Sequence, residues 1–321
     1  MLRTLALFVA IAIGVTAGAA NAQAPYPNRP IRVVIPFGPG GFADITMRLV
    51  GQQLSERSGV QVVIENRPSA GGIIAANAVT SAQPDGYTLF VFSSGIALSK
   101  SLLKTMPFDP ETAFTPVSTL ALFDLLLLVK ADSPSRTVKD ALETARADPG
   151  KFNIGTINPG STQNVTAELL RAVTGIPVTI VPHRATAEVL TSLLRGDTQI
   201  GVESYAALKA PIDAGQIRAI AASGDKRSAM QPDVPTLKES GIDAEVVGWN
   251  SLVAPAGTPK EIIAALNRHV RAIVESPDFQ KRMLDLGGEP KASTPDELEA
   301  RLKSDIEMWA AVVKKAGLEP R

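Results

Sequence analysis

The sequence contains no cysteine and only two histidines, and these shortages exclude several kinds of site. Without cysteine the chain has no disulfide, no thiolate metal ligand and no cysteine nucleophile. His183 and His269 are too few for a histidine-based metal centre, so we expect neither a metal nor a cofactor. Aromatic residues make up only 5% of the 321 residues, which argues against stacking platforms for bases or sugars.

The chain also lacks an excess of charge of either sign. It has 32 Lys and Arg against 32 Asp and Glu, giving a formal charge of zero. A nucleic-acid-binding protein needs surplus basic residues to neutralise phosphates, so we expect no nucleic-acid partner. The 45% of hydrophobic residues suits a globular protein, and the length allows about two domains.

The N-terminus has the pattern of an export signal. Met1 and Arg3 provide a positive start, residues 5–13 are apolar, and Ala20-Asn21-Ala22 has the small-x-small form of a cleavage site. The alternative is a membrane anchor, but the apolar run is short for a span of about 20 residues. We therefore predict a signal peptide at 1–22 and a mature protein in a bacterial periplasm.

Strands and helices are predicted to alternate after this signal. Apolar β-branched runs predict strands, and stretches of 8–17 residues that end near glycines predict helices between them. This order favours an α/β fold with largely parallel sheets and helices on both faces. The expected strands include 31–36, 87–92, 121–129, 152–155, 178–181, 198–202 and 217–222. The expected helices include 42–58, 73–82, 137–147, 162–174, 187–195, 204–214 and 260–275, 278–286 and 295–315.

Ligands of such sheets bind beyond the carboxyl ends of the strands, where two glycine-containing loops stand out. The first, 36–44, leads into a helix whose N-terminus is suited to bind an anion. The alternative is a glycine-rich turn capped by its aspartate. Its candidate ligand-binding residues are Phe37, Gly40, Gly41, Phe42, Ala43 and Asp44.

The second loop, 155–164, is rich in hydroxyl and amide groups that serve as neutral donors to a ligand rich in oxygen. The alternative is a simple helix cap made by Ser161 or Thr162. One loop in each half predicts a cleft that holds an anion from both sides. The candidates here are Thr156, Gly160, Ser161, Thr162, Gln163 and Asn164, and Ser93 and Ser94 end another strand.

A series of short motifs resembles the Bug family, the periplasmic solute-binding proteins of tripartite tricarboxylate transporters. The resemblance covers essentially the whole mature chain. The motifs are YPNRPI at 26–31, PFGPGGFAD at 36–44, VIENRP at 63–68, AGG at 70–72, AQPDGYTL at 82–89, AFTP at 113–116, PDVPT at 232–236 and APAGTP at 254–259.

The resemblance implies a periplasmic-binding-protein-like fold of two α/β domains with the ligand cleft between them. Family members are similar in holding a small carboxylate with backbone N–H groups, hydroxyls and water, without catalysis. We expect one domain from 23–122 plus 226–321 and the other from 123–225. The expected partners are a di- or tricarboxylate, amino acid or aromatic acid and the membrane subunits of the transporter, and we expect a monomer.

Three departures from the family pattern concern the ligand. Asn164 stands where relatives usually carry histidine, His183-Arg184-Ala185 replaces a common Tyr-Lys-Gly, and Glu203 places a carboxylate at a strand end. Our hypothesis is that His183, Arg184, Ala185 and Glu203 tune the distal half of the site. The alternative for Glu203 is an exposed charge paired with a neighbour such as Arg184.

Two other functions remain open from the sequence. A periplasmic hydrolase would need His183 as its base, and the chain has no G-x-S-x-G nucleophile motif. A binding protein that reports to a sensor kinase would have the same sequence features as a transport receptor.

Overall fold

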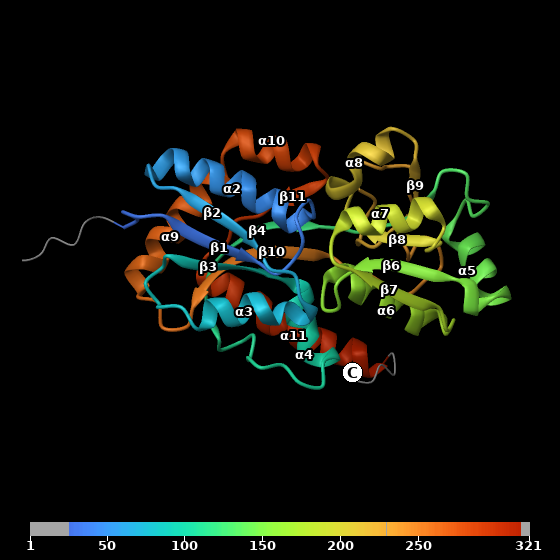
Figure 1. The fold of residues 1–321 in the computed structure, drawn as a ribbon, viewed down its shortest axis with the longest axis horizontal. Coiled ribbons are helices and arrows are strands. Elements are labelled where there is room, and N and C mark those ends of the chain that lie inside the picture. Colours follow the sequence, from blue (N-terminus) through green and yellow to red (C-terminus); the bar gives the residue numbers. More distant parts are fainter. Residues whose placement is uncertain (1–25, 229, 316–321) are drawn as a thin grey trace, which may run out of the picture.

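Two separate sheets carry the strands in the computed structural model, which describes residues 26–228 and 230–315. The predicted signal peptide at 1–22 lies outside the described residues. The sheets lie side by side, each covered by helices (Figure 1). We call 26–123 with 248–315 the first lobe and 126–222 the second lobe. The predicted α/β class, with helices flanking two sheets, is confirmed.

The first lobe contains a six-stranded sheet in the order β11-β4-β10-β3-β1-β2. Its central strands are apolar and β-branched, such as the IRVVI of β1, and they form the core. The strands are β1 (Ile31–Ile35), β2 (Val62–Asn66), β3 (Thr88–Ser93), β4 (Phe114–Phe123), β10 (Gly248–Pro255) and β11 (Gly288–Pro290). The helices are α2 (Phe42–Ser58), α3 (Ile73–Thr80), α4 (Ser94–Leu102), α9 (Lys260–Val274), α10 (Pro277–Asp285) and α11 (Pro295–Lys315), with a short 3-10 helix η1 (Ala70–Gly72).

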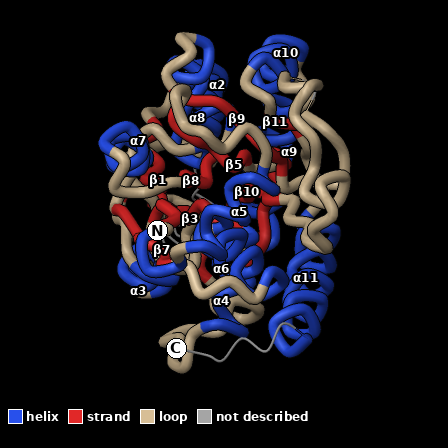
Figure 2. The backbone as a smooth tube through the Cα atoms, turned by 90° about the vertical axis from the view of Figure 1, so that its right-hand side faces the viewer, coloured by secondary structure: helices blue, strands red, loops and turns tan. Residues whose placement is uncertain are grey.

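The second lobe contains a five-stranded sheet in the order β7-β6-β8-β5-β9. Viewed from this end of the molecule, the strands lie inside and the helices outside (Figure 2). The strands are β5 (Leu126–Lys130), β6 (Asn153–Ile157), β7 (Thr179–His183), β8 (Ile200–Glu203) and β9 (Ile217–Ala222). The helices are α5 (Val138–Ala147), α6 (Thr162–Thr174), α7 (Thr186–Arg195) and α8 (Tyr205–Asp213), with a 3-10 helix η2 (Pro149–Lys151).

Both sheets are mixed, whereas the sequence predicted largely parallel ones. Strands β2, β1 and β3 are parallel, as are β7, β6 and β8. Strand β10 is antiparallel to β3 and β4, and β5 is antiparallel to β8 and β9. Strands β10 and β5 each enter their sheet directly after a crossing from the other lobe. The parallel strands of the same sheet end on the side that faces the other lobe, so β10 and β5 run in the opposite direction. Edge strand β11 is also antiparallel to β4.

Two crossing segments, 124–125 and 223–247, connect the lobes. The predicted single strand at 121–129 is therefore wrong: the apolar run ends β4, crosses at Asp124 and begins β5. Ser223 ties the crossings together, because its Oγ accepts from the N–H of Leu125 at 2.9 Å and donates to the carbonyl of Val246 at 2.7 Å. The two connections form one hydrogen-bonded unit.

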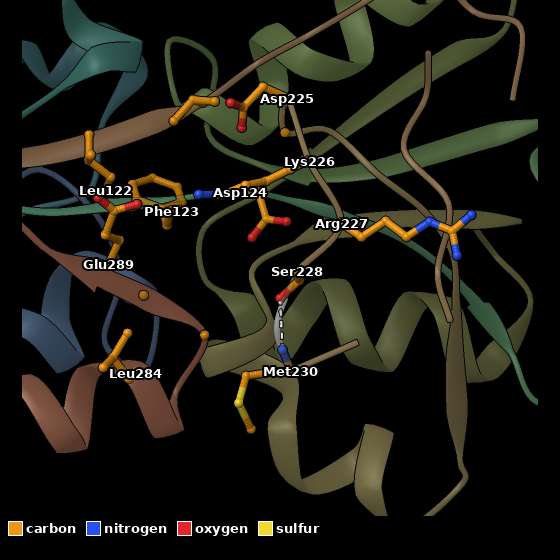
Figure 3. Close-up of a pocket in the computed structure, with 14 residues that line it drawn as sticks. Leu122, Phe123, Asp124, Asp225, Lys226, Arg227, Ser228, Met230, Leu284 and Glu289 are labelled. Carbon is orange, nitrogen blue, oxygen red and sulfur yellow. Dashed lines mark hydrogen bonds between the residues drawn. The ribbon is translucent and has the colours of Figure 1, made fainter. Parts of the chain in front are cut away.

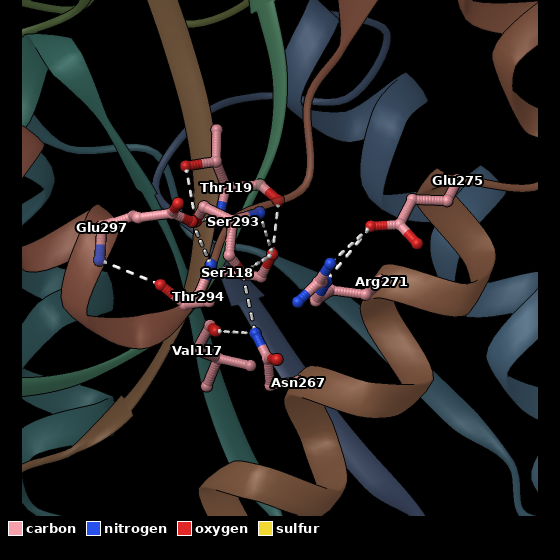
Figure 4. A network of polar contacts seen from close by, with 9 residues as sticks. All are labelled: Val117, Ser118, Thr119, Asn267, Arg271, Glu275, Ser293, Thr294 and Glu297. Atoms are coloured by element: carbon pink, nitrogen blue, oxygen red, sulfur yellow. Dashed lines mark hydrogen bonds and ion pairs between the residues drawn. The ribbon is translucent and has the colours of Figure 1, made fainter.

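A buried polar network anchors the C-terminal helices to the first sheet (Figure 4). The Asn267 side-chain N–H₂ of α9 donates to the carbonyls of Val117 and Ser293, at 2.7 and 2.8 Å. Ser293 also exchanges hydrogen bonds with Ser118 and Thr119 of β4. These bonds satisfy backbone groups that would otherwise be buried unpaired, so they fix α11 to the first lobe.

Candidate functional site

A small cavity lies between the lobes, with walls from six chain segments. It encloses about 20 Å³, enough for one or two water molecules. Its lining comes from the β1–α2 loop and first turn of α2, the ends of β3 and β4, the start of α6, and β6 and β10. The lining residues are Phe37, Gly41, Phe42, Ala43, Ser93, Phe123, Ile157, Thr162, Gln163 and Asn250.

Three helix N-termini contribute to this lining. Helix α2 begins at Phe42, as the sequence predicted, and its N-cap Gly41 provides no side-chain cap. Helix α4, which the sequence analysis missed, follows the N-cap Ser93, and α6 begins at Thr162. The first turn of a helix carries N–H groups without intrahelical acceptors and a partial positive charge. The convergence of three such ends makes the cavity suited to a negatively charged group.

Two buried side chains in the lining have hydrogen-bonding capacity to spare. Ser93 Oγ and Asn250 Nδ2 are buried and lack a hydrogen-bond partner in this structure. Both residues are 1% exposed. Buried polar groups are normally satisfied, and an unpaired one costs about 1–3 kcal/mol. A ligand oxygen that accepts from both groups would recover that cost.

Direct contacts close the two lobes around the cavity. Ser94 Oγ and Thr162 Oγ1 are 3.0 Å apart, and the N–H of Gly71 donates to the carbonyl of Pro159 at 2.8 Å. Gly95 lies so close to the second lobe that an added Cβ would be 2.5 Å from the Thr162 nitrogen and 2.6 Å from the Gly160 carbonyl oxygen. The approach therefore requires glycine at position 95.

Asp44 supports the first loop and does not line the cavity. Its carboxylate accepts from the N–H of Gly40 at 3.0 Å, from Arg48 at 2.9 Å and from the Asn66 side chain at 3.0 Å. Burial alone would raise the pKa of Asp44, but these hydrogen bonds lower it below its ordinary value. Asp44 thus fixes the turn that precedes α2, in agreement with the turn alternative.

Glu203 is fully buried and is not paired with Arg184, so the exposed-charge alternative is wrong. Its carboxylate accepts from Thr186 Oγ1 at 2.6 Å, from Gln163 Nε2 at 3.1 Å and from the backbone N–H of Ser204 at 2.8 Å. Burial raises the pKa of Glu203, although these hydrogen bonds oppose the shift. The buried Glu203 carboxylate thus holds the side chain of Gln163, which lines the cavity, against the core of the second lobe.

We expect Glu203→Ala to lower the free energy of unfolding by about 3 kcal/mol or more, because it leaves three buried donors unpaired. Glu203→Gln should cost less than about 1 kcal/mol, since one amide oxygen still accepts and the Thr186 hydroxyl can rotate to accept from the new N–H₂. Urea unfolding of both variants measures this difference. Equal losses would show that the negative charge of Glu203, which both variants remove, and not its hydrogen-bonding geometry, sets its contribution to stability.

The remaining predicted residues lie around the cavity without lining it. Ser161 caps α6 by accepting from the Asn164 N–H at 3.0 Å, as the cap alternative stated. The Asn164 side chain in turn donates to Thr156 Oγ1 at 3.3 Å. Gly160 and Ala185 contact the first lobe at Ser99 and Gly38, while Gly40 and Arg184 are exposed. His183 Nε2 is buried without a partner.

Sequence reasoning missed three lining residues: Phe123, Ile157 and Asn250. Asn250 lies within a fully buried strand, GWNSLVAP, where an amide among apolar residues is the available signal of a binding role. Phe123 ends β4 within an apolar run, and nothing in its sequence context separates it from other core residues. Ile157 ends β6 inside the candidate loop 155–164, and it was passed over because that loop was interpreted through its hydroxyl and amide groups.

A second cavity of about 200 Å³ lies beside the crossings (Figure 3). Asp124 extends into it, with Asp225 of the other crossing also in the lining. Asp124 Oδ2 is buried without a partner, and burial, aided by the Asp225 charge, raises the pKa of Asp124 to about 6. A titratable group thus lies where the lobes are joined.

None of the helices within residues 26–228 and 230–315 is both long and apolar enough to cross a membrane. Among the same residues no three carboxylate or histidine side chains gather as a metal site would require.

Two α/β lobes with a small cavity between them define the class of the protein: it has the fold of a periplasmic binding protein. The structure of the periplasmic binding protein BugD matches with a TM-score of 0.87 and 30% identity, over 92% of this chain and 100% of BugD. The family model for the tripartite tricarboxylate transporter family receptor matches residues 46–318. The chain belongs to this family of solute-binding receptors, and the resemblance to the Bug family is confirmed.

Other relatives agree with this assignment. Protein BugT of Bordetella pertussis is 31% identical over 313 residues, which cover 95% of this chain and 96% of BugT. The structure of Rhodopseudomonas palustris MatC (Rpa3494) with bound malate matches with a TM-score of 0.85 and 29% identity, over 90% of this chain and 100% of MatC. The structure of R. palustris Rpa4515 with adipate matches with a TM-score of 0.88 and 34% identity, over 92% and 100% of the two chains.

Proposed function

We propose that this protein captures a small carboxylate between its lobes and delivers it to a tripartite tricarboxylate-type transporter in the membrane. The observation that carries the proposal is the cavity where the N-termini of α2, α4 and α6 meet, with Ser93 Oγ and Asn250 Nδ2 unpaired in its wall. The malate- and adipate-bound relatives support a carboxylate ligand.

Hydrogen bonds suffice for this binding without an arginine clamp. Each hydrogen bond to a charged group contributes about 1.5–3 kcal/mol, so four to six of them contribute roughly 6–18 kcal/mol. Association and ordering cost several kcal/mol. A micromolar Kd requires about −8 kcal/mol, which lies within the remainder.

We further propose that the lobes act as the two expected domains, 23–122 plus 226–321 and 123–225. A ligand that contacts both favours the closed arrangement, and the transporter then distinguishes the loaded form by its shape. In this proposal the protein is exported by residues 1–22, works as a monomer in the periplasm and catalyses no reaction.

The hydrolase alternative receives no support from the geometry of its base. His183 makes no hydrogen bond to a serine among the described residues, and Ser161 Oγ is engaged in capping α6. Incubation of the protein with the bound acid, followed by mass spectrometry, tests the point, because a receptor returns its ligand unchanged. Co-purification with a sensor kinase, without transporter subunits, would favour the signalling alternative.

We expect Ser93→Ala to weaken carboxylate binding about ten- to a hundredfold, because the variant loses one donor to a charged oxygen. Titration calorimetry with the acid that raises the melting temperature most, chosen from mono-, di- and tricarboxylates and amino acids, measures the change. Ser192→Ala, at a buried serine of α7 outside the cavity, is the matched control. Unchanged affinity in Ser93→Ala would remove this residue from the site.

A further inference from the structure

A groove of about 650 Å³ separates α6 of the second lobe from α11 of the first lobe. Ala172 and Val173 belong to the α6 wall, and Met308 and Val312 belong to the α11 wall. Residues of the crossing 223–247, among them Val247, lie between the two walls. We call this space the α6–α11 groove. Because its walls belong to different lobes, its width depends on how the lobes are arranged.

The α6–α11 groove exposes apolar side chains from both lobes and from the crossing. Val173 is 40% exposed, Val247 is 39% exposed and Met308 is 50% exposed. Six large hydrophobic residues are exposed in the described part of the chain, and these are three of them. Apolar surface in water is unfavourable. An arrangement of the lobes that brings the two walls together therefore gains free energy by burying these side chains.

The groove lies across the molecule from a contact that closes the lobes beside α7. An added Cβ at Gly38 would lie 2.7 Å from Ala185 Cβ, so the first loop contacts the start of α7. Viewed along the long axis of the molecule, α7 and α11 lie on opposite sides (Figure 2). A rotation about the crossings that separates Gly38 from Ala185 therefore moves α6 toward α11.

We infer that the α6–α11 groove sets the balance between the open and closed lobes, because it narrows as the ligand cleft opens. Burial of Val173, Val247 and Met308 in the narrowed groove favours the open, empty form. The contacts that a ligand makes with both lobes must outweigh this burial. A side chain that fills the groove then favours the closed form and raises ligand affinity without touching the ligand. The inference rests on the proposed function, since it needs a ligand that closes the lobes.

Ala172→Trp and Met308→Trp, which add an indole from opposite walls, test this inference. The groove seen in the structure has room for the indole, so the closed form accommodates it and the narrowed form does not. The acid that raises the melting temperature most is titrated calorimetrically into the full mature protein. We expect each variant to bind this acid at least fivefold more tightly than the wild type does.

Ala310→Trp is the matched control for the added indole. Ala310 is an exposed residue of α11, two positions from Met308 and so on the opposite face of the helix. This variant should bind the acid within twofold of the wild-type affinity. Melting curves verify that all three variants are folded.

Small-angle X-ray scattering provides a measurement that needs no ligand. Mass spectrometry first verifies that each preparation is free of co-purified ligand. The radius of gyration of Ala172→Trp and of Met308→Trp should fall toward the value calculated for the closed lobes. Ala310→Trp should keep the larger value of the ligand-free wild type.

The outcomes separate the inference from the proposed function. If the two groove variants bind the acid no more tightly than the wild type, or if their ligand-free scattering equals that of the wild type, the inference is overturned while carboxylate capture stands. If no acid binds to the wild type or to any variant, the proposed function fails, and the scattering comparison alone decides whether the groove controls the lobes.

Discussion

Replacing Gly95 with alanine is expected to weaken ligand binding at least a hundredfold without unfolding either lobe. The new Cβ would lie 2.5 Å from the Thr162 nitrogen and 2.6 Å from the Gly160 carbonyl oxygen, so the closed arrangement is excluded. Apparent affinity falls in proportion to the population able to bind, and a hundredfold loss corresponds to about 2.7 kcal/mol. Titration calorimetry with the preferred acid measures it.

The same substitution should not destabilise the protein without ligand. Gly95 lies in the first turn of α4, where alanine has the better helix propensity by about 0.5–1 kcal/mol. Gly150→Ala is the matched control, because an added Cβ there meets only the Asp148 side chain at 3.8 Å. Wild-type affinity in the Gly95 variant would show that binding does not require this close approach.

Replacing Asp124 with asparagine is expected to stabilise the protein at pH 8 by about 2–3 kcal/mol and to have little effect near pH 4. The folded-state pKa of about 6 exceeds the ordinary value of 3.8. The folded protein therefore binds this proton more tightly than the unfolded chain. The stabilisation that comes from this bound proton is complete below about pH 4 and is lost as the pH rises through 6. Asparagine keeps the shape without the charge.

Urea unfolding at several pH values measures this effect. Asp132→Asn, at a side chain that is 72% exposed, serves as the control and should follow the wild-type profile. If the free energy of unfolding of Asp124→Asn depends on pH in the same way as that of the wild type, the Asp124 carboxyl is hydrated in the folded protein. Burial then does not raise its pKa. Since Asp124 joins the lobes, binding affinity at pH 5 and pH 8 should be measured alongside.

Local features of the fold were predictable from sequence because neighbouring residues determine them. Helix α2 begins at Phe42 and ends before Gly59, whose φ of 73° suits glycine. Ser161 caps α6 with its own side chain. The direction of β10 was not predictable, because it depends on the chain returning from the other lobe. The run at 121–129 was misread for the same reason: an apolar pattern does not reveal which sheet it joins.

The candidate site was partly predictable for the same physical reason. Each of the two glycine-containing loops is one continuous stretch of sequence, so their lining residues other than Ile157 could be named from the sequence. Asn250 reaches the cavity from a strand more than 150 residues beyond Ser93, and the two are cross-strand partners. Glu203 contacts Gln163 and Thr186 only because β8, α6 and α7 converge, so a strand-end carboxylate in the sequence could not reveal its burial.

The position of Trp249 has a consequence for following this protein in solution. Its backbone N–H donates to Ser94 Oγ, which in turn contacts Thr162 of the second lobe, and its indole Nε1–H donates to Asp305 of α11. The next residue, Asn250, lines the cavity. Trp249, one of only two tryptophans in the chain, is thus hydrogen-bonded to residues at the boundary between the lobes. Its intrinsic fluorescence should change when the lobes open or close, so closure can be followed without an attached dye.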